Sequence, residues 1–534
     1  MSDMTRASFG EDRADGDRRR PAWLPAAAGT LILTIAVAIA LMPGELFVKT
    51  LVIDDALFYS AIARGIAQGQ GSTFDDGLTH TNGYHPLWCW LQVPVAFIWG
   101  GGDPMIHIWW VKLLAVITIL LMFWVWYRLV APVLVDSVAT AVFLLLLGGY
   151  WWSVSVLYGL METPLVLLFV GLSLLWARRF ASNPSAGHRH AAVLGFLMAG
   201  ALLARLDSVF FVGLLALWLA VQVGRRRRPL VLGTALATAA ACVLPYLIWN
   251  LVNFGNIVPV SGLRKTSALD LAARLSTLGD FWTGKWIKVV QLLHPVGLAL
   301  LALGLVVVLW IFGRELVRTM GRTWGLLWLL PAAACAHAAY ITLFMTEGNV
   351  QWYHYLEYAS LYLLVATGGG VISSWCLRRG LRRLRYLPPL IVGLLIVLLL
   401  AAYVPANMSV SGRSVIYDMA EWARDNLEPD SRCGMYDPGI FRVVSGLSTL
   451  GLNGLVGDQE LLEIARSRSV NRAIDRYGLN YIVTFAHVRA LADVDPGEIA
   501  YASPEIVKLG IGTCRYVILE ASAYGGAGVK LPAR

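Results

Sequence analysis

The chain has 534 residues, of which 57% are hydrophobic and only 14% are charged, and its mean hydropathy is +0.64. A water-soluble core cannot hold so much apolar surface, so we expect a polytopic α-helical protein embedded in the lipid bilayer. The net charge of +9 arises in short basic clusters between apolar runs. These clusters lack the aromatic interleaving of a nucleic-acid surface, which argues against nucleic-acid binding.

The N-terminal residues 1–21 are polar and charged and are expected to form a cytoplasmic tail. The apolar run that follows has no small-residue cleavage site at its end, which predicts an uncleaved signal anchor. This run opens a transmembrane domain that we expect to extend over residues 22–405.

Apolar runs of spanning length recur through that domain and predict about eleven transmembrane helices. They lie at about 22–43, 107–127, 133–152, 163–177, 190–204, 206–223, 229–250, 291–313, 324–345, 355–374 and 387–405. A further run at 86–100 is short, contains a proline and leads into three consecutive glycines. If this run lies at the membrane interface, every basic cluster falls on the cytoplasmic side, as the positive-inside rule requires.

With this orientation, the long first external loop (residues 44–106) and residues 406–534 lie outside the cytoplasmic (inner) membrane of a bacterium. In the C-terminal part charged residues return and helix and strand patterns alternate, which predicts a small extracytoplasmic α/β domain. We expect helices at 415–426, 458–467 and 470–477, strands at 432–436, 479–485 and 514–519, and a turn at Asp437-Pro438-Gly439.

Two adjacent carboxylates, Asp54 and Asp55, stand at the outer end of the first span. Carboxylates in such a place are solvated, paired or bound to a metal, because burial of their charge is costly. One of them is a candidate general base, with its neighbour orienting it or holding a metal; a solvated helix end is the structural alternative. We leave open which is the base, with a slight preference for Asp54. In the same loop, the polar, glycine-rich run that follows the pair ends in Asn82, Tyr84 and His85, which are candidates for a substrate pocket.

A third carboxylate, Glu162, lies at the start of a later span, on the same outer side of the membrane as Asp54 and Asp55. Pro164 follows it in the first turn of that span. A glutamate at a helix start also serves as ordinary capping chemistry. Three acidic groups at one membrane surface nevertheless indicate a site for a divalent metal such as Mg²⁺ or Mn²⁺, with Asp55 and Glu162 as ligands, or for a metal-bridged phosphate.

Charged residues in two other places are candidates for the same site. Arg205 and Asp207 lie between two short apolar runs, where they either line the site or pair to hold the turn. Arg264 and Lys265 lie in an outer loop, where the positive-inside rule does not place cations and where they suit a phosphate.

An aromatic and imidazole cluster, Trp352, Tyr353 and His354, stands at the outer end of another span. It is a candidate part of the donor and acceptor pocket, with an aromatic interface belt as the alternative. Walker, dinucleotide, HExxH and CxxC motifs are all missing from the sequence, so no nucleotide cofactor is expected.

The motifs together resemble those of the membrane glycosyltransferases of the GT-C fold that use polyprenyl-phosphate sugars. This family includes the protein O-mannosyltransferases, the aminoarabinose transferase and the actinobacterial arabinofuranosyltransferases. The resemblance rests on the Asp54-Asp55 pair, TNGYHPLW at 81–88, GLMETP at 159–164, LARLDSVFF at 203–211, NIVPVSGLRK at 256–265 and the external C-terminal domain. The stretch Gly83-Tyr84-His85-Pro86-Leu87 departs from the mannosyltransferase pattern and looks closer to the arabinofuranosyltransferase-like branch.

The resemblance implies an inverting transfer of a hexosyl or pentosyl group from a polyprenyl-phosphate donor to an extracytoplasmic glycan, lipid or protein acceptor. It implies that one of Asp54 and Asp55 is the base, that Glu162 is a second acid, and that His85, Arg205 and Lys265 are candidates for the lipid phosphate. Two other functions stay open: a lipid-linked sugar flippase or transporter, and a membrane-anchored cell-envelope assembly protein. Cys433 and Cys514, each on an expected strand, form either a disulfide or two buried thiols.

Overall fold

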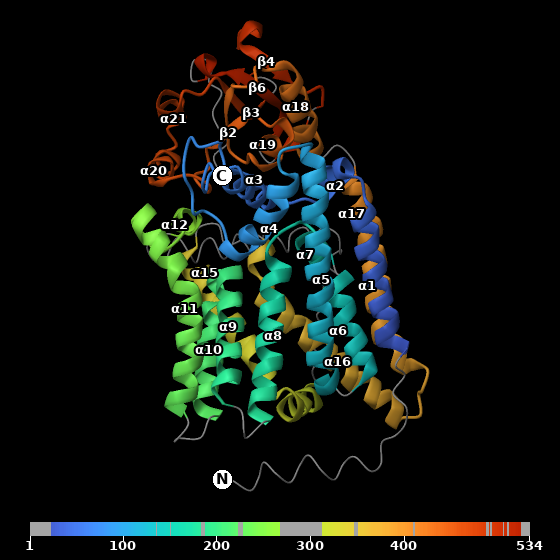
Figure 1. The fold of residues 1–534 in the computed structure, drawn as a ribbon. Helices are drawn as coiled ribbons and strands as arrows, with labels where there is room; N and C mark the ends of the chain where they lie inside the picture. Colours follow the sequence, from blue (N-terminus) through green and yellow to red (C-terminus); the bar gives the residue numbers. More distant parts are fainter. Residues whose placement is uncertain are drawn as a thin grey trace.

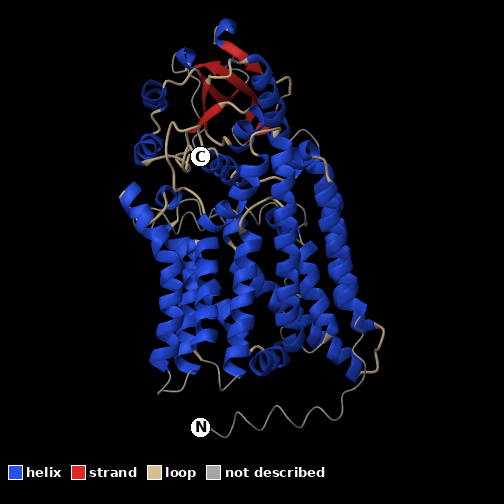
Figure 2. Cartoon of the chain, viewed as in Figure 1, coloured by secondary structure: helices blue, strands red, loops and turns tan. Residues whose placement is uncertain are grey.

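The computed structural model describes residues 23–134, 136–149, 151–182, 187–222, 228–266, 312–345, 351–408, 412–487, 491, 494–505, 507–509 and 512–524. A bundle of long helices occupies one end of the molecule and a small α/β domain occupies the other (Figure 1). Strands are confined to the α/β domain (Figure 2). The expected fold class, a helical membrane protein with a small C-terminal α/β domain, is confirmed.

The helical bundle accounts for most of the predicted spans. Its helices are α1 (Trp23–Leu41), α5 (Pro104–Leu134), α6 (Ser137–Gly149), α8 (Thr163–Ser182), α9 (His188–Ala204), α10 (Val209–Gln222), α11 (Arg228–Phe254), α15 (Leu329–Phe344), α16 (Tyr355–Arg378) and α17 (Leu387–Met408). Within the described residues, six helices are long and apolar enough to cross a membrane, and several apolar helices are shorter. The span expected at 291–313 lies outside the described residues, as does the N-terminal tail.

A layer of short helices separates the bundle from the α/β domain (Figure 1). It contains α2 (Gly44–Thr50), α3 (Ala56–Ala67), α4 (Pro86–Trp99), α7 (Trp151–Leu157) and α12 (Val260–Lys265). The run expected at the interface forms α4, which has 14 residues and is too short to span a bilayer. It packs against α3, where Ser60 donates a hydrogen bond of 2.9 Å to Gln92.

The α/β domain is built on one mixed sheet in the order β2-β1-β3-β6-β4, with β5 also paired to β6. The strands are β1 (Arg432–Met435), β2 (Ser448–Gly451), β3 (Tyr481–His487), β4 (Ile499–Ala502), β5 (Val507–Leu509) and β6 (Gly512–Glu520). β1 runs parallel to β2 and β3, whereas β6 runs antiparallel to its neighbours. The helices are α18 (Gly412–Asn426), α19 (Gly439–Ser445), α20 (Gln459–Ser467) and α21 (Val470–Tyr477).

The predicted turn at Asp437-Pro438-Gly439 leads directly into a helix that was not predicted. The chain bends at Asp437, and Pro438 is the N-cap of α19, which has seven residues. The helix was missed because proline is compatible with a helix start as well as with a turn, and seven residues are too few to show a period.

The two cysteines of the α/β domain lie on different strands of the sheet. Cys433 on β1 pairs with Tyr481, at the start of β3, whereas Cys514 on β6 pairs with His487, at its end. Six residues of strand span about 20 Å, which is far beyond the reach of a disulfide. Of the two alternatives, the register therefore favours two buried thiols.

Candidate active site

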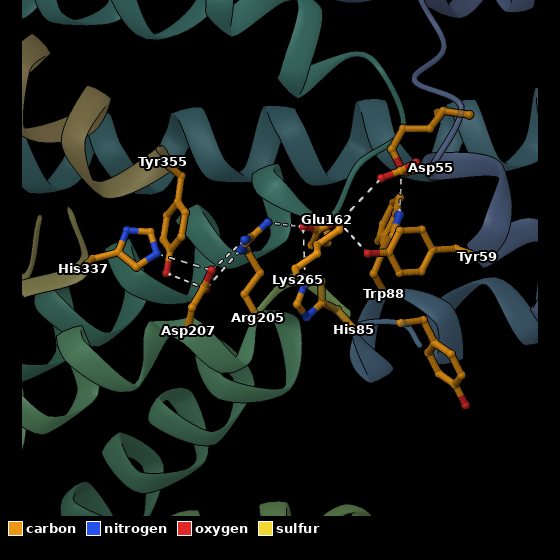
Figure 3. A network of polar contacts seen from close by, with 12 residues as sticks. Asp55, Tyr59, His85, Trp88, Glu162, Arg205, Asp207, Lys265, His337 and Tyr355 are labelled. Atoms are coloured by element: carbon orange, nitrogen blue, oxygen red, sulfur yellow. Dashed lines mark hydrogen bonds and ion pairs between the residues drawn. The ribbon is translucent and has the colours of Figure 1, made fainter. Parts of the chain in front are cut away.

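Charged side chains from distant parts of the sequence converge where the bundle meets the layer of short helices (Figure 3). Asp55 stands at the start of α3, His85 is the N-cap of α4, and Glu162 directly precedes α8. Arg205 follows α9, and Lys265 ends α12. The fold thus brings together residues that the sequence pattern singled out in five separate segments.

Glu162 and Arg205 form the buried centre of the network. Both side chains are fully buried and form an ion pair through Glu162 Oε1 and Arg205 Nη1. Glu162 Oε2 accepts a hydrogen bond of 2.8 Å from Tyr59, a residue of α3 that the sequence pattern did not single out. Arg205 also binds Asp207 through Nε at 3.1 Å and through Nη2 at 2.6 Å. Its donors on three nitrogens are therefore directed at two carboxylates.

The network continues into the bundle through residues that were not predicted from the sequence. His337 of α15 lies with Nε2 3.3 Å from Asp207 Oδ2 and with Nδ1 2.9 Å from Glu357 Oε1 of α16. Acidic and basic side chains therefore alternate from Glu357 through His337, Asp207 and Arg205 to Glu162, and the fully buried Arg205 and Glu162 are paired with each other. An imidazole inside an apolar span was the sequence signal that could have identified His337.

Lys265 and Asp55 form the more open side of the site. Their Nζ and Oδ2 atoms lie 3.8 Å apart, and the Asp55 side chain keeps 22% of its surface exposed. The ring of Tyr353 is near both cations, with its centroid 5.4 Å from Lys265 Nζ and 5.0 Å from the guanidinium of Arg205. Cation–π attraction to one ring therefore links the open and buried parts of the network.

The loop before Glu162 is held close to the acidic pair. Ile53 N–H donates to the carbonyl of Gly159 at 3.2 Å, and Trp88 Nε1 donates to the carbonyl of Leu160 at 2.8 Å. Leu160 has a φ of +66°, a strained conformation for a residue with a branched side chain. These contacts fix the approach of Glu162 to Tyr59.

Asp54 faces away from this network. Its Oδ2 accepts the amide of Gly439 at 2.9 Å and its Oδ1 accepts the amide of Ile440 at 2.8 Å, both at the start of α19. Burial, together with the nearby carboxylate of Asp437, raises the pKa of Asp54 to about 7. The two adjacent carboxylates are thus in different environments, one against the α/β domain and one beside Lys265.

The other predicted residues of the first loop line the same region. Asn82 accepts the amide of Val260 at 2.9 Å through Oδ1, and its Nδ2 is buried without a partner among the described residues. The Tyr84 hydroxyl accepts a hydrogen bond of 2.9 Å from Ser72. His85 Nε2 lies 3.7 Å from Glu162 Oε1, and burial lowers the pKa of its imidazole.

The remaining candidates lie around the edge of the site. Arg264 points to the α/β domain, where its Nε donates to the carbonyl of Asn453 at 3.0 Å. Trp352 stacks against Tyr353, and His354 is the N-cap of α16.

The expected metal ligands do not fit a metal centre. Both oxygens of Glu162 are taken, one by Arg205 and one by Tyr59, and Asp55 lies beside a lysine. Across the described part of the chain, no group of three or more His, Cys, Asp or Glu side chains could hold a metal ion. We therefore assign no step of the chemistry to a metal.

No protein-family model matches the sequence, and neither does any curated protein. The fold is similar to ArnT from Cupriavidus metallidurans bound to undecaprenyl phosphate, with a TM-score of 0.56, 13% identity, and coverage of 93% of this chain and 98% of that one. It is also similar to the Archaeoglobus fulgidus oligosaccharyltransferase in complex with zinc and sulfate, with a TM-score of 0.52, 13% identity, and coverage of 92% and 72%.

A third structure is the A. fulgidus oligosaccharyltransferase AglB in complex with an inhibitory peptide and a dolichol-phosphate. Its TM-score is 0.50 and its identity 14%, with coverage of 91% of this chain and 74% of that one. ArnT and AglB are both glycosyltransferases of the GT-C fold. At these identities the similarity establishes the fold, and this chain has the GT-C fold.

Proposed function

We propose that this protein is an inverting glycosyltransferase that moves a sugar from a polyprenyl-phosphate donor to an extracytoplasmic acceptor. The observation that carries the proposal is the pairing of a partly exposed carboxylate, Asp55, with Lys265 beside the buried Glu162–Arg205 pair. A carboxylate beside a cation supplies the base and the phosphate partner that such a transfer needs. The lipid phosphates bound by ArnT and AglB support a donor of this class.

In the proposed reaction Asp55 is the general base. The acceptor hydroxyl gives its proton to the Asp55 carboxylate as its oxygen forms a bond to the anomeric carbon. The bond from that carbon to the phosphate oxygen breaks, and polyprenyl phosphate leaves with the bonding electrons. Attack opposite the leaving group inverts the anomeric configuration.

Lys265 serves the leaving group in this mechanism. When Asp55 takes up the proton its charge disappears, and the ammonium of Lys265, 3.8 Å away, is left to face the charge that develops on the phosphate. Arg205 is less suited to the phosphate because its donors already bind Glu162 and Asp207. Its part is to fix Glu162, and through it Tyr59 and the start of α3.

The distribution of basic residues supports an extracytoplasmic site. Arg178 and Arg179 lie near the end of α8, and further arginines run from Arg378, the last residue of α16, to Arg385, just before α17. Both segments lie at the end of the bundle away from the α/β domain (Figure 1). By the positive-inside rule a basic end of this kind is the cytoplasmic one, which supports the proposal that the site and the α/β domain lie outside.

The proposal is tested by Asp55→Asn in membranes supplied with a panel of radiolabelled polyprenyl-phosphate hexoses and pentoses. Loss of a general base lowers kcat by about 10²–10⁴-fold, and we expect a loss in this range. Asp425→Asn, at an exposed aspartate of α18, is the matched control and keeps full transfer. Full transfer by Asp55→Asn would remove Asp55 from the chemistry.

A further inference from the structure

We propose that Asp54 is a positioning residue, which docks the α/β domain onto the first loop and thereby sets the orientation of Asp55. The role in catalysis rests on the proposed function, whereas the docking does not. The α/β domain is on this view a structural part of the active site and not an independent appendage.

The contact of Asp54 uses both oxygens of its carboxylate. They accept the backbone amides of Gly439 and Ile440 at 2.9 and 2.8 Å, from a segment almost at the other end of the chain. Gly439 lies so close that a Cβ on it would come within 2.1 Å of the Asp54 carbonyl oxygen. Glycine is required here because the two backbones are in contact, and any larger residue would separate them.

A second backbone contact lies at the other end of the polar run that follows the acidic pair. A Cβ on Gly83 would come within 1.9 Å of the carbonyl oxygen of Leu455 in the α/β domain. Gly83 directly precedes Tyr84 and His85, so this contact fixes the loop just before it reaches the site.

The middle of the loop is held by side chains of the α/β domain. Arg442 of α19 donates through Nε to the carbonyl of Phe74 at 3.1 Å and forms an ion pair with Asp76. Ser448 of β2 donates to the carbonyl of Asp75 at 2.8 Å. The α/β domain therefore holds the segment from Asp54 to Gly83 of the first loop at its start, middle and end.

The docking of Asp54 acts on Asp55 through the backbone. Asp55 has helical φ and ψ of −57° and −25°, and Leu57 N–H donates to the carbonyl of Asp54 at 3.0 Å. Consecutive residues of a helical turn project about 100° apart. With Asp54 fixed to the amides of α19, the carboxylate of Asp55 is left to point to Lys265.

The test combines amide hydrogen exchange with steady-state kinetics of the full chain in detergent or nanodiscs. Asp54→Ala removes both acceptors, and we expect exchange at Gly439 and Ile440 to be at least about tenfold faster. We also expect kcat to fall about tenfold or more with little change in the KM of the donor, as for a misplaced base. Asp54→Asn keeps one acceptor and should retain kcat within about tenfold of the wild type.

Asp55→Asn is the matched control, because it removes the adjacent carboxylate and leaves the contact with α19 intact. It should lose transfer while the amides of Gly439 and Ile440 exchange as in the wild type. If Asp54→Asn is as inactive as Asp55→Asn with unchanged exchange, Asp54 acts in the chemistry itself and the positioning role is overturned. Unchanged exchange in Asp54→Ala overturns the docking.

Gly83→Ala tests the same docking without changing either carboxylate, should Asp54→Ala fail to fold. The added methyl separates the loop from Leu455, and we expect faster exchange at Gly439 and Ile440 together with a lower kcat. Wild-type exchange and kcat in this variant would contradict the proposal. Full transfer by Asp55→Asn would defeat the proposed base, whereas the exchange rates at Gly439 and Ile440 would still decide whether Asp54 docks the α/β domain.

Discussion

Arg205 shows how much a single buried charge depends on its surroundings. Its guanidinium binds one carboxylate on each side, Glu162 through Nη1 and Asp207 through Nε and Nη2, and it lies against the rings of Tyr353 and Tyr355. A buried pair of this kind contributes little net stability when intact, because desolvation offsets the attraction. Its loss is costly, because Glu162 then remains fully buried without the cation that pairs with it.

We therefore expect Arg205→Met to lower the free energy of unfolding by about 3–5 kcal/mol. The methionine fills similar volume, but Glu162 and Asp207 lose their shared cation. Arg476→Met is the control. Arg476 of α21 forms an exposed ion pair with Glu460 of α20, so this substitution should change the stability little. Thermal unfolding of both variants in detergent measures the difference, and equal unfolding temperatures would show that Arg205 is not an essential counter-ion.

Helices could be predicted from the sequence where the periodic segment was long or where capping residues marked its ends. The helices expected at 458–467 and 470–477 correspond to α20 and α21, and Asp458 caps α20 by accepting the amide of Leu461 at 2.8 Å. Strands β2, β4 and β5 were missed, and each has only three or four residues. The sequence pattern is weak in segments this short, and pairing with neighbouring strands decides their conformation.

The candidate site was predictable to the extent that charge is conspicuous in an apolar chain. Asp55, Glu162, Arg205 and Lys265 were identifiable because an ionised group at a membrane surface needs a partner. Tyr59 could not be identified from the sequence, because tyrosine is common in amphipathic helices. Tertiary contacts decide which carboxylate pairs with which cation. The different surroundings of Asp54 and Asp55 could therefore not be predicted from their adjacent positions in the sequence.

The strand register leads to a prediction for the cysteines of the α/β domain. Because β3 separates Cys433 from Cys514 by almost its full length, both should alkylate as thiols when the protein is denatured without reductant. Peptide mass spectrometry after labelling shows whether Cys433 and Cys514 carry the alkyl group. A peptide pair cross-linked between these two cysteines would mean that the register of β1, β3 and β6 is incorrect.

At the scale of the whole molecule, the two ends differ in chemistry. One end carries the α/β domain, and the other carries the arginines near the end of α8 and those that follow α16 (Figure 1). The charge network lies where the bundle meets the layer of short helices, on the side of the α/β domain. A polar site beside a bilayer suits a donor whose lipid chain stays in the membrane while its phosphate reaches the surface.

This arrangement predicts opposite accessibility of two single cysteines introduced into a cysteine-free chain. In intact cells, a membrane-impermeant maleimide should label Ser522→Cys in the α/β domain and should not label Arg382→Cys between α16 and α17. Both positions are exposed, so each should react in permeabilised cells. Labelling of Arg382→Cys alone in intact cells would reverse the orientation.

The two glycine contacts also restrict how such chains can be recombined. At Gly83 and Gly439 the backbones of loop and α/β domain touch with no side chain between them. A chimera that carries the α/β domain of a relative can form the same backbone contact with the first loop only if the incoming domain has a glycine at the position that faces Asp54. An exchange that ignores this requirement should yield a folded but loosely joined hybrid, whereas moving the loop and the domain together should preserve the join.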